Sequence, residues 1–380
     1  MSRTAETVPS GRPAAASGTA AATAPRDAEG PGRGGARRDG RTAGPRTGAR
    51  ARARAGAWAW AELLRLPALF TVPGDVLAGA AATGVRAGPR TLLAIGSSLC
   101  LYEAGMALND WADRAEDAAE RPHRPIPSGR VRPTAALTAA CGLTAGGLAL
   151  AARAGRPALA VAVPLATTVW AYDLTLKHTP AGPVAMAAAR GLDLLLGAAA
   201  TGGDVRAAVP SAALLGTHTL AVTAVSREET RGGSSLAPLA ALATTGLLAH
   251  LAARRPTRLP AGRGEAATPG LPGPTSAARS RSTDRSLLPG TTFRPTTERI
   301  TSALTSAVTA AYVATAARPY FHAALNPSPP LTQRAVGGGI RATIPLQAAL
   351  TARAGGKATA VLIAALAPLG RKFARKVSIT

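Results

Sequence analysis

Aromatic residues and cysteines are scarce in this sequence. Only 3% of the 380 residues are Phe, Trp or Tyr, although 47% are hydrophobic, and two are cysteines. A soluble globular core normally uses larger side chains to fill space, whereas small residues let helices pack closely in lipid. Cys100 and Cys141 lie inside apolar runs and form neither a disulfide framework nor a metal-binding motif. We interpret them as packing residues within a membrane.

Acidic residues are heavily outnumbered. The chain has 44 Lys and Arg against 20 Asp and Glu, which gives a net charge of +24. Such an excess is typical of proteins that bind nucleic acid or an anionic membrane surface. The arginines, however, lie in the N-terminal segment and between apolar runs, with no basic stripe interleaved with aromatic residues. We therefore expect no nucleic-acid partner, and we expect the charges to orient the chain in a lipid bilayer.

The first 57 residues lack any long apolar run. They contain eleven Arg and four acidic residues among Ala, Gly, Pro and Thr. Such a segment cannot bury enough apolar surface to offset its chain entropy, so we predict a disordered basic cytoplasmic tail over 1–57. We identify no signal peptide in it, and we expect the first membrane helix to direct insertion.

Long hydrophobic runs fill most of the remaining chain. Each is close to the length that crosses a bilayer, so the sequence predicts an all-α, multi-pass protein of the cell membrane with about nine transmembrane helices. The alternative, a soluble alanine-rich bundle, fits these long runs poorly. The predicted helices lie at 63–84, 91–108, 133–152, 157–174, 181–200, 207–226, 234–252, 299–317 and 343–369.

The runs divide the chain into a transmembrane domain at 58–370 and a basic C-terminal tail at 371–380. Residues 253–298 are rich in Pro, Gly, Ser and Arg, and we predict a flexible insertion there. A cytoplasmic N-terminus places the arginine-rich loop at 109–132 inside, as the positive-inside rule requires. Parity puts 253–298 and 371–380 outside although both are basic. Long loops follow the rule poorly, which accounts for the first, whereas the second suggests that the helix count is off by one.

Carboxylates recur at helical spacing after the second run. If that helix continues to about residue 118, Asp110, Asp113 and Asp117 share one face, and Glu103 lies on the same stripe. Like charges stacked in this way repel one another and are costly at a membrane boundary. A divalent cation removes the conflict, and an oxygen-only set of ligands suits Mg²⁺. The alternative is a solvated helix end whose carboxylates pair with nearby arginines.

An arginine- and proline-rich loop follows directly, because residues 121–130 read RPHRPIPSGR. Its three prolines end the helix and stiffen the loop, which holds Arg121 and Arg124 near the carboxylates. A diphosphate carries more negative charge than one Mg²⁺ neutralises. Arginines beside metal-binding carboxylates therefore favour a diphosphate ligand.

The pattern N-D-x-x-D-x-x-x-D at 109–117, followed by R-P-x-R-P-I-P-S-G-R, resembles the first aspartate-rich motif of the UbiA prenyltransferase superfamily. The resemblance extends over residues 60–370, and nine helices fit that fold. It implies a membrane-embedded, Mg²⁺-dependent transfer of a prenyl group from a prenyl diphosphate to a small-molecule acceptor, which is often aromatic. The metal ligands that it implies are Asp110, Asp113 and Asp117. The groups that it places on the diphosphate are Asn109, Arg121 and Arg124.

Residues 172–177, which read YDLTLK, resemble the Tyr/Lys segment of the same family. The resemblance implies that Lys177 contacts the diphosphate and takes part in catalysis. The alternative is a surface pair between Asp173 and Lys177, which are four residues apart on a helix.

The second aspartate-rich motif of the family is reduced in this chain. At its expected place after the sixth helix, only Glu228 and Glu229 remain. Glu229 is a candidate catalytic residue and a ligand for a second Mg²⁺. Alternatively, it forms a structural pair with Arg227 or Arg231. A site with one complete acidic motif also suits a non-catalytic lipid or metabolite carrier of the cell envelope.

Several other stretches resemble the divergent UbiA-like EboC proteins. They include residues 64–69, 189–197 and 326–340. Within the second stretch, Asp193 is either a site residue inside the membrane or is neutralised by Arg190. Asp75 has no evident partner in the sequence. We interpret His218 as a hydrogen-bonded helix residue rather than a metal ligand.

Overall fold

The computed structural model describes residues 45–229, 234–254 and 296–377. Backbone contacts group Arg50–Thr380 into one unit, which contains all the helices from α2 onward, and Met1–Ala49 into another. The described residues form helices and no strands. The elements are α1 (Pro45–Leu63), η1 (Leu66–Thr71), α2 (Val72–Ala82), α3 (Pro89–Ala112), α4 (Arg114–Glu120), α5 (Pro133–Ala154), α6 (Arg156–Ala171), η2 (Tyr172–Leu176), α7 (Gly182–Ala200), η3 (Val205–Ala208), α8 (Val209–Ser226), α9 (Leu236–Ala253), α10 (Thr296–Leu325), α11 (Pro329–Arg353) and α12 (Lys357–Val377).

Seven helical segments in the described part of the chain are long and apolar enough to cross a membrane. Two shorter apolar helices, Leu69–Ala82 and Lys357–Gly370, accompany them. The prediction of an all-α membrane protein is confirmed, whereas the count of nine spans is not. The seven segments are Pro89–Ala112, Pro133–Ala154, Arg156–Leu176, Gly182–Ala200, Val205–Ser226, Leu236–Ala253 and Glu298–Leu325.

Two predicted runs differ from the observed helices. The first, 63–84, is divided into the end of α1, the 3-10 helix η1 and α2. The last, 343–369, covers parts of α11 and α12, which separate at Gly355, a residue with φ 94°. Helix α11 begins at Pro329, before the predicted start at 343, and its glycine-rich first half packs tightly against α10. A Cβ at Gly338 would lie 2.8 Å from Pro319 Cγ.

The predicted tail and insertion fall largely outside the described residues. Helix α1 begins at Pro45, within the segment 1–57, and its residue Ala59 is buried. Residues 1–44 and 255–295 are not described, so disorder in those segments stays a prediction.

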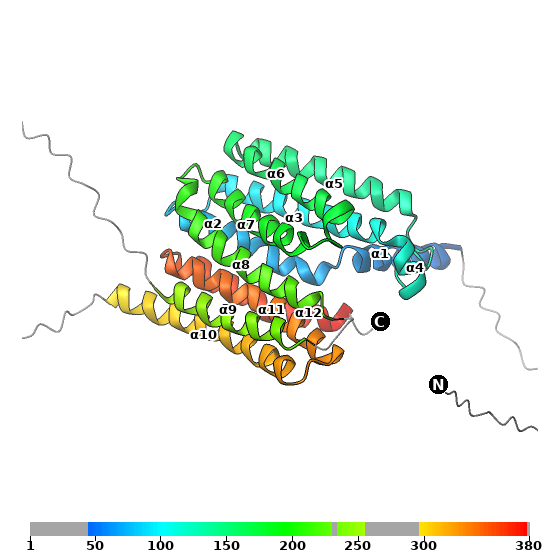
Figure 1. Cartoon of the computed structure of the whole chain (residues 1–380). Helices are drawn as coiled ribbons and strands as arrows, with labels where there is room; N and C mark the ends of the chain where they lie inside the picture. Colours follow the sequence, from blue (N-terminus) through cyan, green and yellow to red (C-terminus); the bar gives the residue numbers. More distant parts are fainter. Residues whose placement is uncertain (1–44, 230–233, 255–295, 378–380) are drawn as a thin grey trace, which may run out of the picture. The chain divides into compact units, whose positions relative to one another are not determined.

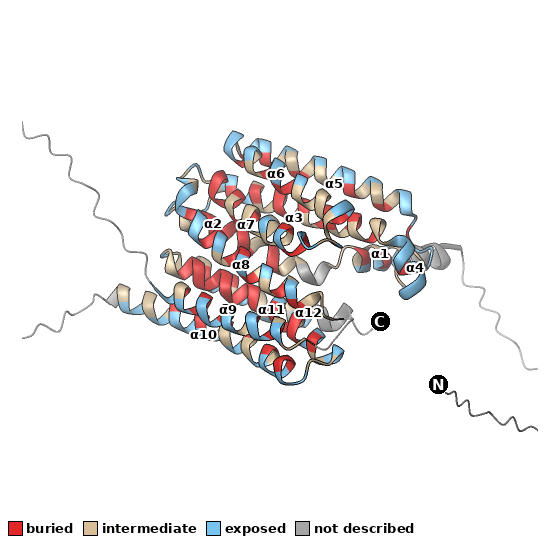
Figure 2. Ribbon diagram, viewed as in Figure 1, coloured by how far each residue is buried: buried red, intermediate tan, exposed pale blue. Residues whose placement is uncertain are grey.

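Within the larger unit, the helices pack side by side in two connected groups (Figure 1). One group joins α3 to α5, α6 to α7 and α2 to α7, and the other joins α9 to α10 and α10 to α11. Contacts of α8 with α7 and α11 link the groups. Figure 2 shows nearly continuous burial along α11, whereas exposed leucines such as Leu92, Leu247 and Leu362 lie on α3, α9 and α12. Exposed leucines on membrane-length helices are suited to contact with lipid.

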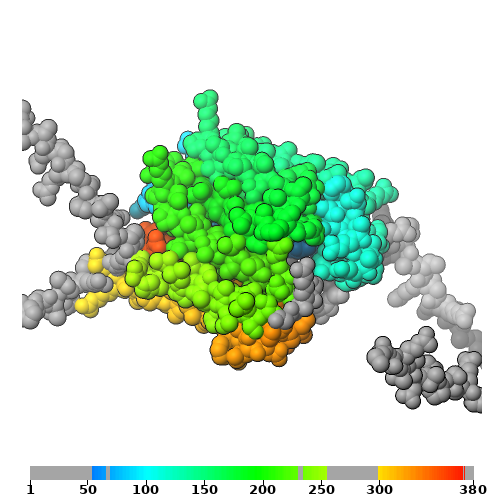
Figure 3. Space-filling view, in the orientation of Figure 1, coloured from blue at the N-terminus to red at the C-terminus, as the bar shows by residue number. Residues whose placement is uncertain are grey.

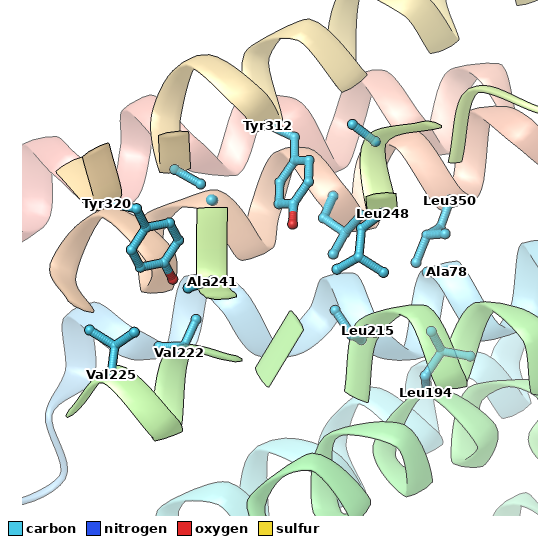
Figure 4. Packing of buried hydrophobic residues seen from close by; sticks show 14 of the residues in the cluster. Ala78, Leu194, Leu215, Val222, Val225, Ala241, Leu248, Tyr312, Tyr320 and Leu350 are labelled. Carbon is cyan, nitrogen blue, oxygen red and sulfur yellow. The ribbon is translucent and has the colours of Figure 1, made fainter. Parts of the chain in front are cut away.

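Two tyrosines are buried in the second group. Tyr312 and Tyr320 point from α10 towards α8, where Tyr320 faces Val222 and Val225 (Figure 4). Both tyrosines are buried in the cluster that also includes Leu248. These two tyrosines therefore fill space between helices that small residues alone would leave underpacked.

Glycines bring α2 and α7 into backbone contact. A Cβ at Gly79 would overlap the Leu194 carbonyl oxygen, and one at Gly197 would overlap the Val76 carbonyl oxygen. Only glycine permits helices to approach so closely, as in other membrane helix pairs. The seam places polar residues of α2 and α7 next to one another inside the unit.

Candidate functional site

The predicted carboxylates gather where α3 ends. Helix α3 includes Asn109 and Asp110, the chain turns at Asp113, and α4 carries Asp117. Asp110 and Asp117 are buried, with 5% and 3% of their surface exposed. Buried carboxylates need charged or hydrogen-bonding partners, and the following loop supplies them.

Arg124 connects the two buried carboxylates. Its Nη1 lies 2.7 Å from Asp117 Oδ2 and 3.7 Å from Asp110 Oδ1. Arg121 Nη1 lies 3.7 Å from Asp117 Oδ1. Arg121 and Arg124 therefore lie beside the carboxylates, as the stiff proline-rich loop predicts. The same loop is tied to α1, because Arg130 Nη1 donates a hydrogen bond of 2.6 Å to Glu62 Oε2.

Arg65 joins this cluster from the start of η1. Its Nη2 donates to Asp110 Oδ1 over 3.1 Å and to Asn109 Oδ1 over 3.5 Å. Its backbone has φ 48° and ψ 46°, the left-handed region, and no other non-glycine residue in the described ranges has a positive φ. Such strain is retained where the surroundings fix the residue, often at functional sites. No feature of the sequence indicated Arg65 as part of the acidic motif, since 45 residues separate it from Asp110.

The cluster of carboxylates and arginines at the end of α3 forms what we call the mouth of the site. Lys177 reaches this mouth from the end of the π-helical turn η2. It forms an ion pair with Asp113. The surface pair between Lys177 and Asp173 is therefore not its observed contact. Asp173 instead accepts a hydrogen bond of 3.1 Å from Asn109 Nδ2. π-helical turns often occur at functional sites, and this turn carries Tyr172 and Asp173 into the cavity wall.

One group of potential metal ligands is close enough to share an ion. Ligand atoms of Asp113, Glu116 and His178 all lie within 4.8 Å of one another, the one such group of three among the described residues. The carboxylates of Asp113 and Glu116 are ligands that Mg²⁺ accepts, and Mg²⁺ commonly keeps several waters. Two of the three donors of this group therefore fit a magnesium ion, whereas His178 offers a nitrogen. The predicted ligands Asp110, Asp117 and Glu229 do not belong to the group. Glu116 was missed because it occupies a variable position of the motif, and His178 because it directly follows the segment 172–177.

Glu229 follows α8 and is half-buried. Burial raises the pKa of its carboxyl group, and the nearby Arg121 lowers it. Arg227 is engaged elsewhere, because its Nη1 donates to the Thr179 carbonyl oxygen over 2.6 Å. Glu229 thus lies within electrostatic reach of the loop that holds the carboxylates. Arg231 lies outside the described residues.

Below this mouth the helices enclose a cavity of 390 Å³. Asn109, Arg65, Asp173 and Ser226 line it near the ends of their helices, and apolar side chains line much of the rest. Among these are Leu101, Met106, Leu165, Val169, Met186, Val222, Val336 and Ile340. In Figure 3, α4 and its loop (cyan) lie at one end, while α8 and α9 (green) cover the centre of this face.

The cavity also reaches a second polar cluster, deep in the helices. Arg190 Nη1 donates to Asp75 Oδ2 over 2.6 Å, and Gln347 Nε2 donates to Asp75 Oδ1 over 2.6 Å. Asp193 accepts a hydrogen bond of 2.7 Å from Ser98. The partner of Asp75, which the sequence did not reveal, is therefore Arg190.

His218 is a structural residue of the bundle. Its Nε2 lies 3.0 Å from the Gly339 carbonyl oxygen, and its Nδ1 lies 3.1 Å from the Tyr312 hydroxyl. Because the carbonyl only accepts, Nε2 carries the proton and Nδ1 accepts from the tyrosine. Both ring nitrogens are thereby engaged between α8, α10 and α11, as the interpretation of His218 predicted.

The fold and the site define an integral membrane protein whose internal cavity has carboxylates, arginines and a lysine at one end. Residues 68–253 match the model of the UbiA prenyltransferase family. The similarity to that family covers 186 of the 380 residues, just under half of the chain.

Curated proteins are similar to parts of this chain as well. The digeranylgeranylglyceryl phosphate synthase of Methanopyrus kandleri is 37% identical over 127 residues, which are 32% of this chain and 45% of the relative. That of Natronomonas pharaonis is 34% identical over 162 residues, 42% of this chain and 58% of the relative. The chain thus spans about half the length of these curated relatives. The finer resemblance to EboC proteins stays a prediction.

A solved structure of digeranylgeranylglyceryl phosphate synthase in membranes shares the fold. The alignment has a TM-score of 0.50 at 15% identity and covers 79% of this chain and 98% of that chain. The likeness in fold therefore extends beyond the region that matches the family model.

Proposed function

We propose that this protein is a membrane-embedded, Mg²⁺-dependent prenyltransferase. It moves a prenyl group from a prenyl diphosphate to a small-molecule acceptor. The observation that carries the proposal is the junction of two environments: buried carboxylates with cationic partners at the mouth, and an apolar-lined cavity of 390 Å³ below it. A prenyl diphosphate is divided in the same way, because a charged diphosphate is joined to an apolar hydrocarbon tail.

The mouth residues bind and orient the diphosphate. Arg121, Arg124 and Lys177 offer N–H donors, and Arg and Lys are the side chains that bind phosphate oxygens best. Asn109 adds a neutral amide beside them. In the proposed complex these donors exchange part of their contacts with Asp113 and Asp117 for contacts with phosphate oxygens.

The carboxylates of Asp110, Asp113 and Asp117 would hold Mg²⁺, with Glu229 facing them from the end of α8. When bound, the ion would draw negative charge onto the departing diphosphate and so weaken the allylic carbon–oxygen bond. Arg124 and Lys177 are cations already held in place, so they stabilise the same negative charge without having to move. Such electrostatic stabilisation is typically the largest contribution to the rate of an enzyme.

The cavity below the mouth protects the reacting carbon from water. Leu101, Val169 and Met186 line it without offering a nucleophile. The allylic cation left by the diphosphate therefore meets the acceptor rather than solvent. The acceptor replaces the diphosphate at that carbon and loses one proton.

The direct test is release of diphosphate by the purified full chain in lipid nanodiscs. Labelled geranyl or geranylgeranyl diphosphate is supplied with Mg²⁺ and a panel of hydroxylated acceptors. We expect labelled product and diphosphate in equal amounts, and loss of both when EDTA removes Mg²⁺. Binding of the labelled diphosphate without any product, across the whole panel, would contradict the proposal.

The reduced second motif favours one other function, a non-catalytic carrier of a prenyl or lipid phosphate. The end of α8 supplies Glu228 and Glu229 in place of a second run of aspartates. A carrier would bind the labelled diphosphate at the mouth in a Mg²⁺-dependent manner and return it unchanged. The nanodisc experiment separates these two functions.

A further inference from the structure

Three potential metal ligands meet at the mouth from two separate segments of the chain. Asp113 and Glu116 come from the start of α4, and His178 follows η2. One ligand atom of each lies within 4.8 Å of the other two. Ligands of a small divalent ion lie about 2.1 Å from it, which places them roughly 3–4 Å from one another. Small rotations of Glu116 and His178, which are both exposed, are enough to bring the three atoms around one ion.

The backbone that carries His178 is held on both sides. Lys177 precedes it and forms the ion pair with Asp113. Thr179 follows it, and its carbonyl oxygen accepts a hydrogen bond of 2.6 Å from Arg227 Nη1. The imidazole is thus attached to a fixed segment beside Asp113. Ligands that are held in place in advance bind an ion more tightly than mobile ones do.

All three side chains can still accept an ion. Lys177 contacts Oδ1 of Asp113, and within the described residues neither Asp113 Oδ2 nor the side chains of Glu116 and His178 form a hydrogen bond or an ion pair. Two neighbouring carboxylates repel each other. A divalent cation between them offsets both negative charges, so the charge of Lys177 remains available for a phosphate.

The nitrogen of His178 decides which ions this group favours. Mg²⁺ prefers oxygen ligands, whereas imidazole suits late first-row metal ions such as Zn²⁺. Zn²⁺ accepts one histidine nitrogen together with carboxylate oxygens, and a set of three protein ligands leaves a position open for water or a substrate oxygen. An oxygen-only set of aspartates lacks this basis for discrimination.

We propose that Asp113, Glu116 and His178 form a mixed nitrogen–oxygen site that binds a late first-row metal ion, such as Co²⁺ or Zn²⁺, more tightly than Mg²⁺. His178 sets this preference, and Mg²⁺ occupies the same group only when it is in large excess. The role of the ion in the reaction rests on the proposed prenyl transfer, whereas its binding does not. An ion held here has its open position beside the place where Lys177 would bind the diphosphate.

The test measures metal binding by the full chain, purified without a polyhistidine tag, in nanodiscs of phosphatidylcholine. Co²⁺ is the probe because its visible absorption reports its ligands, and Mg²⁺ is the competitor. Wild type should retain Co²⁺ against at least about a tenfold excess of Mg²⁺. His178→Gln should weaken Co²⁺ binding by at least about tenfold. It should change Mg²⁺ binding by less than about threefold, because glutamine offers an oxygen that Mg²⁺ accepts.

Two further variants separate the site from general effects. His123→Gln removes another exposed histidine, which lies on the arginine-rich loop and outside the group, and it should leave the preference for Co²⁺ unchanged. Glu116→Gln removes a carboxylate ligand and should weaken the binding of both ions. Because His178 and Glu116 are exposed, neither substitution should disturb the core, and a thermal melt of each variant checks this.

Three results would overturn the inference: equal affinity of wild type for Co²⁺ and Mg²⁺, a preference that His178→Gln leaves intact, or an equal loss of preference in His123→Gln. If the preference depends on His178 but no acceptor leads to release of diphosphate, the metal site stands and the prenyltransferase proposal fails. If Mg²⁺-dependent transfer occurs without any preference for Co²⁺, the prenyltransferase proposal stands and the mixed site is wrong.

Discussion

The ends of α3 and α8 reach the same cavity, yet they carry very different charges. Asn109 lines it at the end of α3, and Ser226 lines it at the end of α8. The end of α3 and the residues that follow it carry Asp110, Asp113 and Asp117 beside arginines, and we call this side of the mouth the α3 wall. The end of α8 is followed by Glu229, near an arginine that binds backbone, and we call this side the α8 wall. The comparison teaches that carboxylates are concentrated on one wall. The working hypothesis is therefore a single magnesium site on the α3 wall.

The largest effect should come from the α3 wall. Replacing Asp113 by Asn removes the carboxylate that Lys177, Glu116 and His178 surround. Prenyl transfer, measured as labelled product, should fall about a thousandfold, because charge stabilisation of the leaving group is lost. The matched control is Glu120→Gln, which neutralises an exposed carboxylate on α4 and should keep full activity. Equal losses in both variants would mean that the metal does not bind at Asp113.

Lys177→Ala should have the next largest effect, a loss of about a hundredfold in kcat/KM. The substitution removes a fixed cation from the mouth and leaves Asp113 without its ion-pair partner. Lys177→Arg keeps the charge and should recover part of the activity. Steady-state kinetics with a labelled prenyl diphosphate provide the measurement. An alanine variant with unchanged kinetics would restrict Lys177 to a structural role.

Arg65 allows backbone strain to be separated from charge. Arg65→Ala and Arg65→Gly both remove the guanidinium from Asp110, so both should lose about tenfold in activity. Glycine adopts the left-handed backbone without strain, so the Gly variant should be more stable than the Ala variant by about 1 kcal/mol. Thermal melts in detergent compare the two. An Ala variant as stable as the Gly variant would show that residue 65 is not strained.

The smallest effect should come from the α8 wall. Glu229→Gln should change activity only a few-fold if one magnesium site suffices. A loss as large as that of Asp113→Asn would show that both walls contribute equally to catalysis.

Burial raises the pKa of Glu229, so the folded protein binds this proton more tightly than the unfolded chain does. Stability of wild type relative to Glu229→Gln should therefore increase as the pH falls through the folded pKa. Melting temperatures of both proteins across acidic to neutral pH check the sign.

The sequence predicted the α3 wall because its parts are close together along the chain. Asp110, Asp113 and Asp117 recur with a helical period, and the arginine loop follows immediately, so local spacing determines their arrangement. Lys177 was found through a family resemblance rather than through spacing. The partner of Lys177, Asp113, was not predicted, because this pair depends on how η2 packs against α3.

Long-range pairs and close helix approaches escaped prediction. Nothing near Asp75 in the chain indicates Gln347, which is 272 residues away. Helix α11 was read as partly loop because glycine and arginine at 334–341 lower its hydropathy, although its glycines serve packing against α10. Periodicity reports which face is apolar, but it does not report which helices meet.

The glycine seam between α2 and α7 has a consequence for the cavity. Because Gly79 and Gly197 hold two backbones together, a larger residue at either place would push apart the helices that carry Asp75 and Asp193. The hydrogen bonds of the deep polar cluster are thereby coupled to two positions that carry no side chain at all. Alanine at either glycine should therefore disturb the Arg190–Asp75 pair although neither residue belongs to it.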